Sequence, residues 1–176
     1  MEAYHVVTER PMYIGQQILF DSNHHNGVYQ RVMDKLHIVK EIYASPHHYS
    51  IDELEHHTAV ALRELALEEF RQQKHPAYPS RMSCLYVSET MEEAEKWAAF
   101  FGQIGRPTYH IVRLQIDGGI FIGDATKCFR GSPDKASNLQ LAEQYWEISQ
   151  APIVKEILAD GTITVLEIVK EINANL

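Results

Sequence analysis

The 176-residue sequence has few of the features that mark the simpler classes of protein. It contains only two cysteines, Cys84 and Cys128, without a metal-binding spacing, so a disulfide framework is not expected and a reducing, cytoplasmic setting is indicated. No uncharged apolar run approaches the roughly 18 residues that a membrane span requires. The first residues form neither a basic nor an apolar leader segment, so we expect no secretion signal.

Positive charge is also scarce, with 16 Lys and Arg against 24 Asp and Glu and a net charge of -8. A protein that binds the phosphate backbone of nucleic acids normally has a basic surface. The composition therefore disfavours nucleic acid as a general partner. Gly-x-Gly-x-x-Gly and His-Glu-x-x-His are absent, so neither a Rossmann dinucleotide site nor a metalloprotease centre is expected.

What is present indicates one globular α+β domain over residues 1–176. The hydrophobic and charged fractions, 45% and 23%, are ordinary for a globular chain of this length. Periodicity predicts strands at 3–7, 84–87, 108–116, 120–122, 153–158 and 162–169. It predicts helices within 28–44 and at 51–73, 91–101 and 138–147. Helices and strands do not alternate regularly, which favours α+β over a parallel sheet.

Local signals predict where several of these elements begin and end. Ser50 with Glu53, and Thr90 with Glu93, fit the capping box that opens a helix. Residues 126–137 are polar and are predicted to form a loop. Asp160-Gly161 is typical of a two-residue hairpin turn between the last two strands.

Histidine is the unusual residue, with ten copies that include three adjacent pairs. Adjacent side chains on a helix point about 100° apart, so a pair does not converge on one metal ion. We expect most of these histidines to be solvated. A metal site formed by His47, His48 and His57, serving a metal-dependent hydrolase, is the alternative.

Three short segments stand out in combination. The segment 4–8 (Tyr-His-Val-Val-Thr) places a histidine on the first strand. The segment 83–88 (Ser-Cys-Leu-Tyr-Val-Ser) is a strand that runs directly into the capped helix. The segment 156–165 begins a late pair of strands with an acid. In this order they resemble the His-Tyr-Glu branch of the ADP-ribosyltransferase-like superfamily, which implies split antiparallel or mixed β-sheets with flanking helices.

The resemblance assigns roles to individual residues. His5 matches the first-strand histidine that contacts a ribose hydroxyl of NAD, and Tyr86 matches the strand tyrosine. Trp97 falls at the position of the aromatic residue that stacks on nicotinamide. Glu156 matches the late-strand glutamate that stabilises the ribose cation. Glu143 is the alternative for that role, although its neighbours have helical rather than strand-like spacing.

The sequence also departs from the pattern of the branch. Val6 replaces the usual glycine, and Ala94 replaces a serine whose hydroxyl binds the nicotinamide amide. Losing that hydroxyl removes a hydrogen bond of about 0.5–1.5 kcal/mol. Arg10 and Arg81 are candidates to clamp a diphosphate through paired hydrogen bonds, with surface salt bridges as the alternative.

The chain as a whole resembles an uncharacterised bacterial family, domain of unknown function 2441. The shared pattern includes Tyr-His-Val near the start, Tyr-Pro-Ser-Arg before the tyrosine strand, and Ala-Glu-x-Tyr-Trp near residue 143. That family implies no established activity.

Together these resemblances imply an NAD-binding protein with NAD as its substrate. The implied activity is ADP-ribosyl transfer or NAD hydrolysis through an oxocarbenium-like ribose centre, with the acceptor left open. The alternative is a non-catalytic module on the same fold that binds a nucleotide or ADP-ribose. The residues at Val6 and Ala94 favour that alternative.

Overall fold

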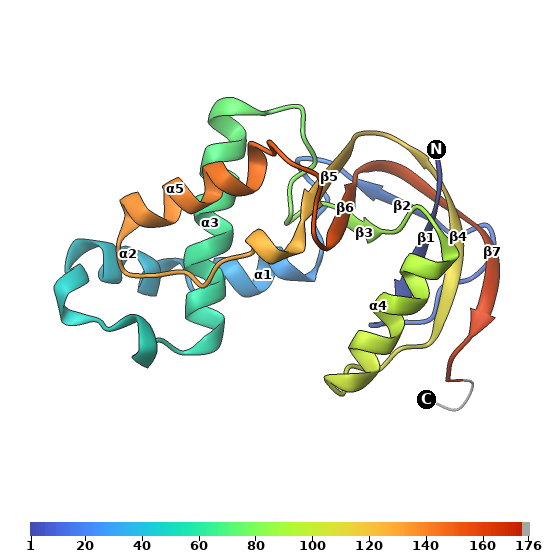
Figure 1. Ribbon diagram of the computed structural model, residues 1–176, viewed down its shortest axis with the longest axis horizontal. Coiled ribbons are helices and arrows are strands. Elements are labelled where there is room, and N and C mark those ends of the chain that lie inside the picture. The colour runs from blue at the N-terminus through green and yellow to red at the C-terminus, as the bar shows by residue number, and fades with distance from the viewer. Residues whose placement is uncertain (174–176) are drawn as a thin grey trace.

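Seven strands form two sheets within residues 1–173, the part of the chain that the computed structural model describes (Figure 1). The first sheet has the order β1 (Glu2–Val7), β4 (His110–Asp117), β7 (Gly161–Glu171), β2 (Gln17–Phe20). The second has the order β3 (Leu85–Val87), β6 (Lys155–Ala159), β5 (Ile120–Asp124). Every strand pair is antiparallel. The α+β class is confirmed, and both sheets are antiparallel rather than mixed.

Two of the four passages of the chain between the sheets are short and lie next to each other. One crossing joins β4 to β5 through Gly118-Gly119, and the other joins β6 to β7 at Asp160. The backbone amide of Asp160 donates to the carbonyl of Gly119 (3.1 Å), and the amide of Gly119 donates to the Asp160 carboxylate (2.7 Å). The predicted Asp160-Gly161 hairpin is therefore wrong. Gly161 has the positive φ of a turn, +79°, but β6 and β7 pair with strands of different sheets.

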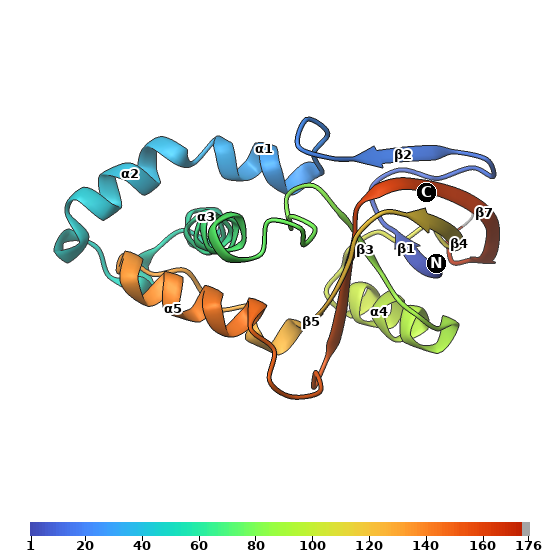
Figure 2. The same cartoon turned by 90° about the horizontal axis from the view of Figure 1, so that it is seen from above.

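Four helices pack together on one side of the sheets, and we call them the helical lobe (Figure 2). They are α1 (Gly27–Met33), α2 (Leu36–Ala44), α3 (His56–Lys74) and α5 (Lys135–Trp146). Buried residues of α3 and α5, including Leu67 and Trp146, pack with Leu158 of β6. The fifth helix, α4 (Met91–Gln103), covers the first sheet instead, through Ala94 packed with Val6. A third cluster of buried residues lies between the two sheets.

Several helix boundaries differ from those predicted. Helix α3 begins at His56 rather than residue 51, because the Glu55 carboxylate accepts from the amides of His57 and Thr58 (both 3.0 Å). Residues 51–53 form a 3-10 turn, and Ser50 makes no side-chain cap there. The helix expected within 28–44 is two helices, α1 and α2. Helix α5 starts inside the predicted 126–137 loop, since Asp134 caps it. The Thr90–Glu93 capping box is confirmed.

No helix within residues 1–173 is both long enough and apolar enough to span a bilayer.

Candidate functional site

Three of the predicted site residues lie on neighbouring strands where the two sheets meet. β1 bridges to β3, with the Tyr4 amide donating to the carbonyl of Ser88 (2.8 Å). One residue along, Nδ1 of His5 donates to the carbonyl oxygen of Tyr86 (2.7 Å). β3 in turn pairs with β6, the strand of Glu156. His5, Tyr86 and Glu156 are thus brought together although 151 residues (156 − 5) separate the first from the last.

A buried arginine links Tyr86 and Glu156. Nε of Arg81 donates to Glu64 of α3 (2.9 Å), and Nη1 donates to Glu156 and to the hydroxyl of Tyr145 (2.7 Å). The guanidinium carbon lies 5.6 Å from the ring centroid of Tyr86 and 5.0 Å from that of Tyr145. We call these five residues the Arg81 cluster. Arg81 is only 6% exposed, so its charge requires the two carboxylates beside it.

The charges within the Arg81 cluster stabilise one another. Burial alone would raise the pKa of Glu64, but the guanidinium groups of Arg81 and Arg63 hold the pKa of that carboxyl below its ordinary value. Burial opposes the charge of Arg81, yet the neighbouring acidic groups, Glu64 above all, keep its pKa well above the ordinary value. Both side chains are therefore charged at neutral pH. The guanidinium group of Arg81 donates hydrogen bonds within the protein, to Glu64, Tyr145 and Glu156.

The two oxygens of Glu156 have different surroundings. Oε1 accepts from Arg81, from the hydroxyl of Tyr145 (2.7 Å) and from the thiol of Cys128 (3.9 Å). Oε2 accepts no hydrogen bond from residues 1–173, and no buried side-chain oxygen or nitrogen in that part of the chain is without a partner. Oε2 is therefore in contact with solvent, although the Glu156 side chain is only 12% exposed. The protein fixes the carboxylate through Oε1, while Oε2 makes no hydrogen bond within residues 1–173.

His5 is a neutral imidazole in the folded protein. Burial lowers its pKa from the ordinary 6.5 to about 4, and Arg106 and His110 act in the same direction. Because the carbonyl of Tyr86 can only accept, the Nδ1 atom of His5 holds the proton. His5 therefore fixes β1 to β3 at the place where the sheets meet.

We expect His5 to make stability fall with acid. Its folded pKa lies below its unfolded pKa, so stability from the neutral ring is complete above about pH 6.5 and is lost as pH falls toward about 4. The loss is on the order of 2–3 kcal/mol. Urea unfolding at about pH 7 and about pH 4.5 measures it. A His5→Asn variant, which keeps a donor for Tyr86 but does not titrate, should lose less. An equal loss in both proteins would contradict this assignment.

Three other residues that the resemblance placed at the NAD site, Val6, Ala94 and Trp97, lie elsewhere. Ala94 and Val6 are buried (0% and 4% exposed) between α4 and the first sheet. Trp97 is half-buried, packs on Phe101 with ring centroids 5.9 Å apart, and lines a groove of about 910 Å³ that also includes Lys155. The residues lining this groove do not include His5, Tyr86 or Glu156. The structure places Trp97 apart from the Arg81 cluster.

The two remaining candidates lie outside the Arg81 cluster. Glu143 is exposed on α5, and Arg10 is exposed just after β1. No hydrogen bond within residues 1–173 joins the side chain of either residue to Arg81, Tyr86 or Glu156. The structure thus separates Glu156 from its rival Glu143 by environment.

Two members of the Arg81 cluster, Glu64 and Tyr145, were not predicted. Glu64 is an acid on the buried face of α3, 2% exposed, and an acid at a helical position otherwise occupied by Leu and Ala is the signal that could have found it. Tyr145 lies in the Ala-Glu-x-Tyr-Trp segment and is fully buried. Neither could be tied to Arg81 without knowing how the helical lobe docks.

The histidine pairs do not converge. Within residues 1–173, no three His, Cys, Asp or Glu side chains are placed to hold one metal ion. His47, His48 and His57 are all exposed. The alternative metal site at these three residues is therefore not formed.

A family model described as "Protein of unknown function (DUF2441)" matches residues 3–171. No curated protein matches the chain.

Proposed function

The chain belongs to the DUF2441 family, and from the geometry of its site we propose that it cleaves NAD. The reaction is ADP-ribosyl transfer or NAD hydrolysis, on a fold of the ADP-ribosyltransferase-like superfamily. Glu156 is the catalytic carboxylate, and Tyr86 and His5 lie beside it.

The arrangement of the strands supports this proposal. The three positions that match the His-Tyr-Glu pattern lie on β1, β3 and β6, which are contiguous across the junction of two small antiparallel sheets. A side chain or backbone contact joins each position to the next, from His5 to Tyr86 and, through Arg81, to Glu156. Apolar side chains can pack in a core without such a series of polar contacts.

The observation that carries the proposal is that the two oxygens of the Glu156 carboxylate differ: the protein holds Oε1 but makes no hydrogen bond to Oε2 within residues 1–173. When the bond between nicotinamide and ribose breaks, the electron pair leaves with nicotinamide and positive charge develops at the ribose carbon. A fixed carboxylate near that carbon stabilises the charge, and a fixed group needs little reorganisation as the reaction proceeds. Arg81 and Tyr145 fix Glu156 through Oε1, while Oε2 remains available to a ribose hydroxyl and the cation. Water or another nucleophile then bonds to the ribose carbon.

Glu156→Gln tests the assignment. We expect nicotinamide release from NAD to fall about 100-fold or more, because the amide keeps the shape but not the charge. NAD binding, measured by calorimetry, should persist. Glu143→Gln is the matched control and should leave release unchanged, since Glu143 is exposed on α5. Loss of activity in the Glu143 variant, with activity retained in the Glu156 variant, would reverse the assignment.

A second candidate function is a non-catalytic module that binds ADP-ribose. The observation that favours it is the pairing of Glu156 with Arg81, which offsets part of the negative charge that a ribose cation would need. This candidate predicts that ADP-ribose raises the melting temperature of the wild-type protein while NAD remains intact after prolonged incubation. Release of nicotinamide by the wild type, lost in Glu156→Gln, excludes it.

A further inference from the structure

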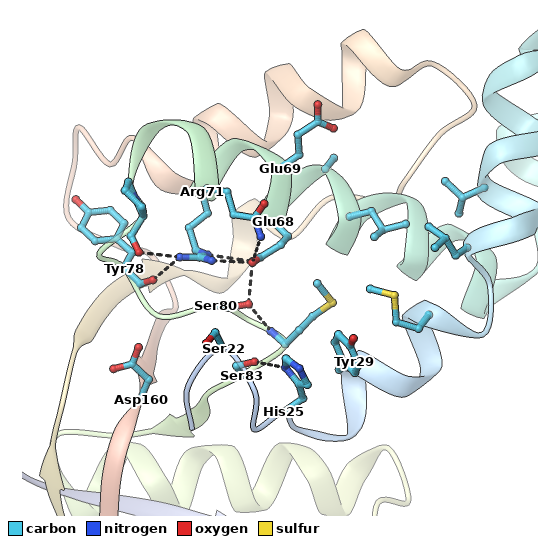
Figure 3. A pocket seen from close by; sticks show the side chains of 18 of the residues that line it. Ser22, His25, Tyr29, Glu68, Glu69, Arg71, Tyr78, Ser80, Ser83 and Asp160 are labelled. Atoms are coloured by element: carbon cyan, nitrogen blue, oxygen red, sulfur yellow. Dashed lines mark hydrogen bonds and ion pairs between the residues drawn. The ribbon is translucent and has the colours of Figure 1, made fainter. Parts of the chain in front are cut away.

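A separate cavity lies in the helical lobe (Figure 3). Its volume is about 720 Å³, within the roughly 300–1,000 Å³ that is usual for small-molecule sites. Residues of α1, α2 and α3 line it together with the segment 76–83. Ser80, Met82 and Ser83 face the cavity, whereas Arg81 between them bonds Glu64 and Glu156. The cavity and the Arg81 cluster thus lie against the same segment but are distinct.

A stacked pair of rings forms part of the cavity wall. The rings of His25 and Tyr29 lie 3.7 Å apart between centroids, and their planes differ by 10°. Asn26, between them in sequence, fixes this segment: its amide donates to the carbonyl of Met82 (3.0 Å), and its side chain donates to those of Arg81 (2.9 Å) and Cys84 (3.0 Å). The ring pair is therefore positioned before any ligand arrives, which reduces the entropic cost of binding.

The ring pair has a polar edge and an apolar surround. Nδ1 of His25 hydrogen-bonds the hydroxyl of Ser83 (2.5 Å), as Figure 3 shows, so Nε2 is the nitrogen left for a ligand. Nε2 makes no hydrogen bond within residues 1–173. The apolar lining residues are Met33, Leu36, Val39, Leu65, Ala66, Pro76 and Met82. A flat ring whose edge can exchange a hydrogen bond fits these surroundings, because aromatic faces stack and the nitrogen satisfies the edge.

The charges around the cavity argue against a phosphate-rich ligand. Its acidic residues are Asp21, Glu68, Glu69 and Asp160, and its basic residues are Lys40, Arg71 and Lys135. Arg71 is paired with Glu68 (2.7 Å), and Lys135 is paired with Glu69 (3.4 Å). Four acids against three bases leave a slight negative excess, which repels an anion carrying several charges.

We propose that this cavity is a second ligand site, for an uncharged heteroaromatic molecule of nucleoside size that stacks on the Tyr29–His25 pair. The ligand ring lies against the stacked rings, and its edge hydrogen-bonds Nε2 of His25. This site does not depend on the NAD reaction proposed above, because it uses no residue of the Arg81 cluster.

Calorimetric titration with adenosine, guanosine, cytidine and uridine tests the site. We expect at least one of these probes to bind, and ribose and adenosine triphosphate to bind at least tenfold more weakly than that probe. Tyr29→Leu should weaken binding of the probe at least tenfold, and so should His25→Ala, a substitution at an exposed residue. Tyr13→Leu is the matched control, since Tyr13 is 66% exposed and lies outside the cavity.

The proposal would be overturned if none of the four nucleosides bound, if the triphosphate bound as tightly as the nucleoside, or if Tyr13→Leu and Tyr29→Leu weakened binding equally. Nicotinamide release by Tyr29→Leu separates the two sites, because it should match that of the wild type. A nucleoside whose binding is abolished by Glu156→Gln but unchanged in Tyr29→Leu would lie in the Arg81 cluster and would also overturn the assignment.

Discussion

Replacing Arg81 with methionine is expected to lower the free energy of unfolding by about 3–5 kcal/mol, because a buried carboxylate then loses its partner. Methionine fills most of the same volume, so the loss comes from charge rather than from a cavity. Glu64 is 2% exposed and would retain only Arg63 (3.0 Å), while Glu156 would lose its cation altogether. Urea unfolding at neutral pH measures the change.

Two further variants identify the source of that loss. Glu64→Gln, added to Arg81→Met, should recover part of the stability, because it removes the uncompensated charge. Arg113→Met is the control for a surface ion pair: Arg113 bonds Glu2 and Glu167 and is 32% exposed, so it should cost no more than about 1 kcal/mol. If Arg81→Met and Arg113→Met lowered the free energy of unfolding equally, the charges of the Arg81 cluster would not stabilise one another more than a surface ion pair does.

Gly118→Ala is expected to destabilise the protein by about 4 kcal/mol or more, at the upper end of single substitutions. A Cβ atom at position 118 would lie 2.0 Å from the carbonyl oxygen of Asp160. That contact is with backbone, so no side chain can rotate to relieve it, and the two crossings between the sheets would have to separate. Thermal unfolding followed by circular dichroism measures the effect.

Gly102→Ala is the matched comparison for Gly118→Ala. Gly102 lies in α4, and a Cβ atom there would have no neighbour within 4 Å. Alanine is the better helix former, so this variant should gain about 0.5–1 kcal/mol. We therefore expect Gly118→Ala to lower the stability of the protein and Gly102→Ala to raise it. Similar melting temperatures would show that the crossings tolerate the extra carbon.

Local chemistry made much of the fold predictable. The β-branched residues of β1 and the Thr90–Glu93 box of α4 act within a few residues of where they lie, and both were placed correctly. The crossing at Asp160-Gly161 was not predicted, because an Asp-Gly pair is compatible with both a hairpin turn and a crossing between sheets. Pairing of β6 with β3 and β5 decides between them, and that pairing joins distant segments.

The same contrast holds for the candidate site, where local segments predict some residues but not the contacts between distant segments. Short segments of the sequence predict His5, Tyr86 and Glu156, and the structure places them on adjoining strands. Trp97 faces a different groove, because helical spacing determines which face of α4 a residue lies on but not what that face packs against. Glu64 and Tyr145 join the site through Arg81, a contact between three segments that no local pattern encodes.

Because Arg81 lies between Glu64 and Glu156, the arrangement of the site depends on the packing of two parts of the fold. Glu64 belongs to the helical lobe and Glu156 to the second sheet, so the Arg81 side chain joins two parts of the fold. A chain whose helical lobe has not docked lacks the arrangement that fixes Glu156. The orientation of the Glu156 carboxylate therefore depends on the docking of the helical lobe against the second sheet.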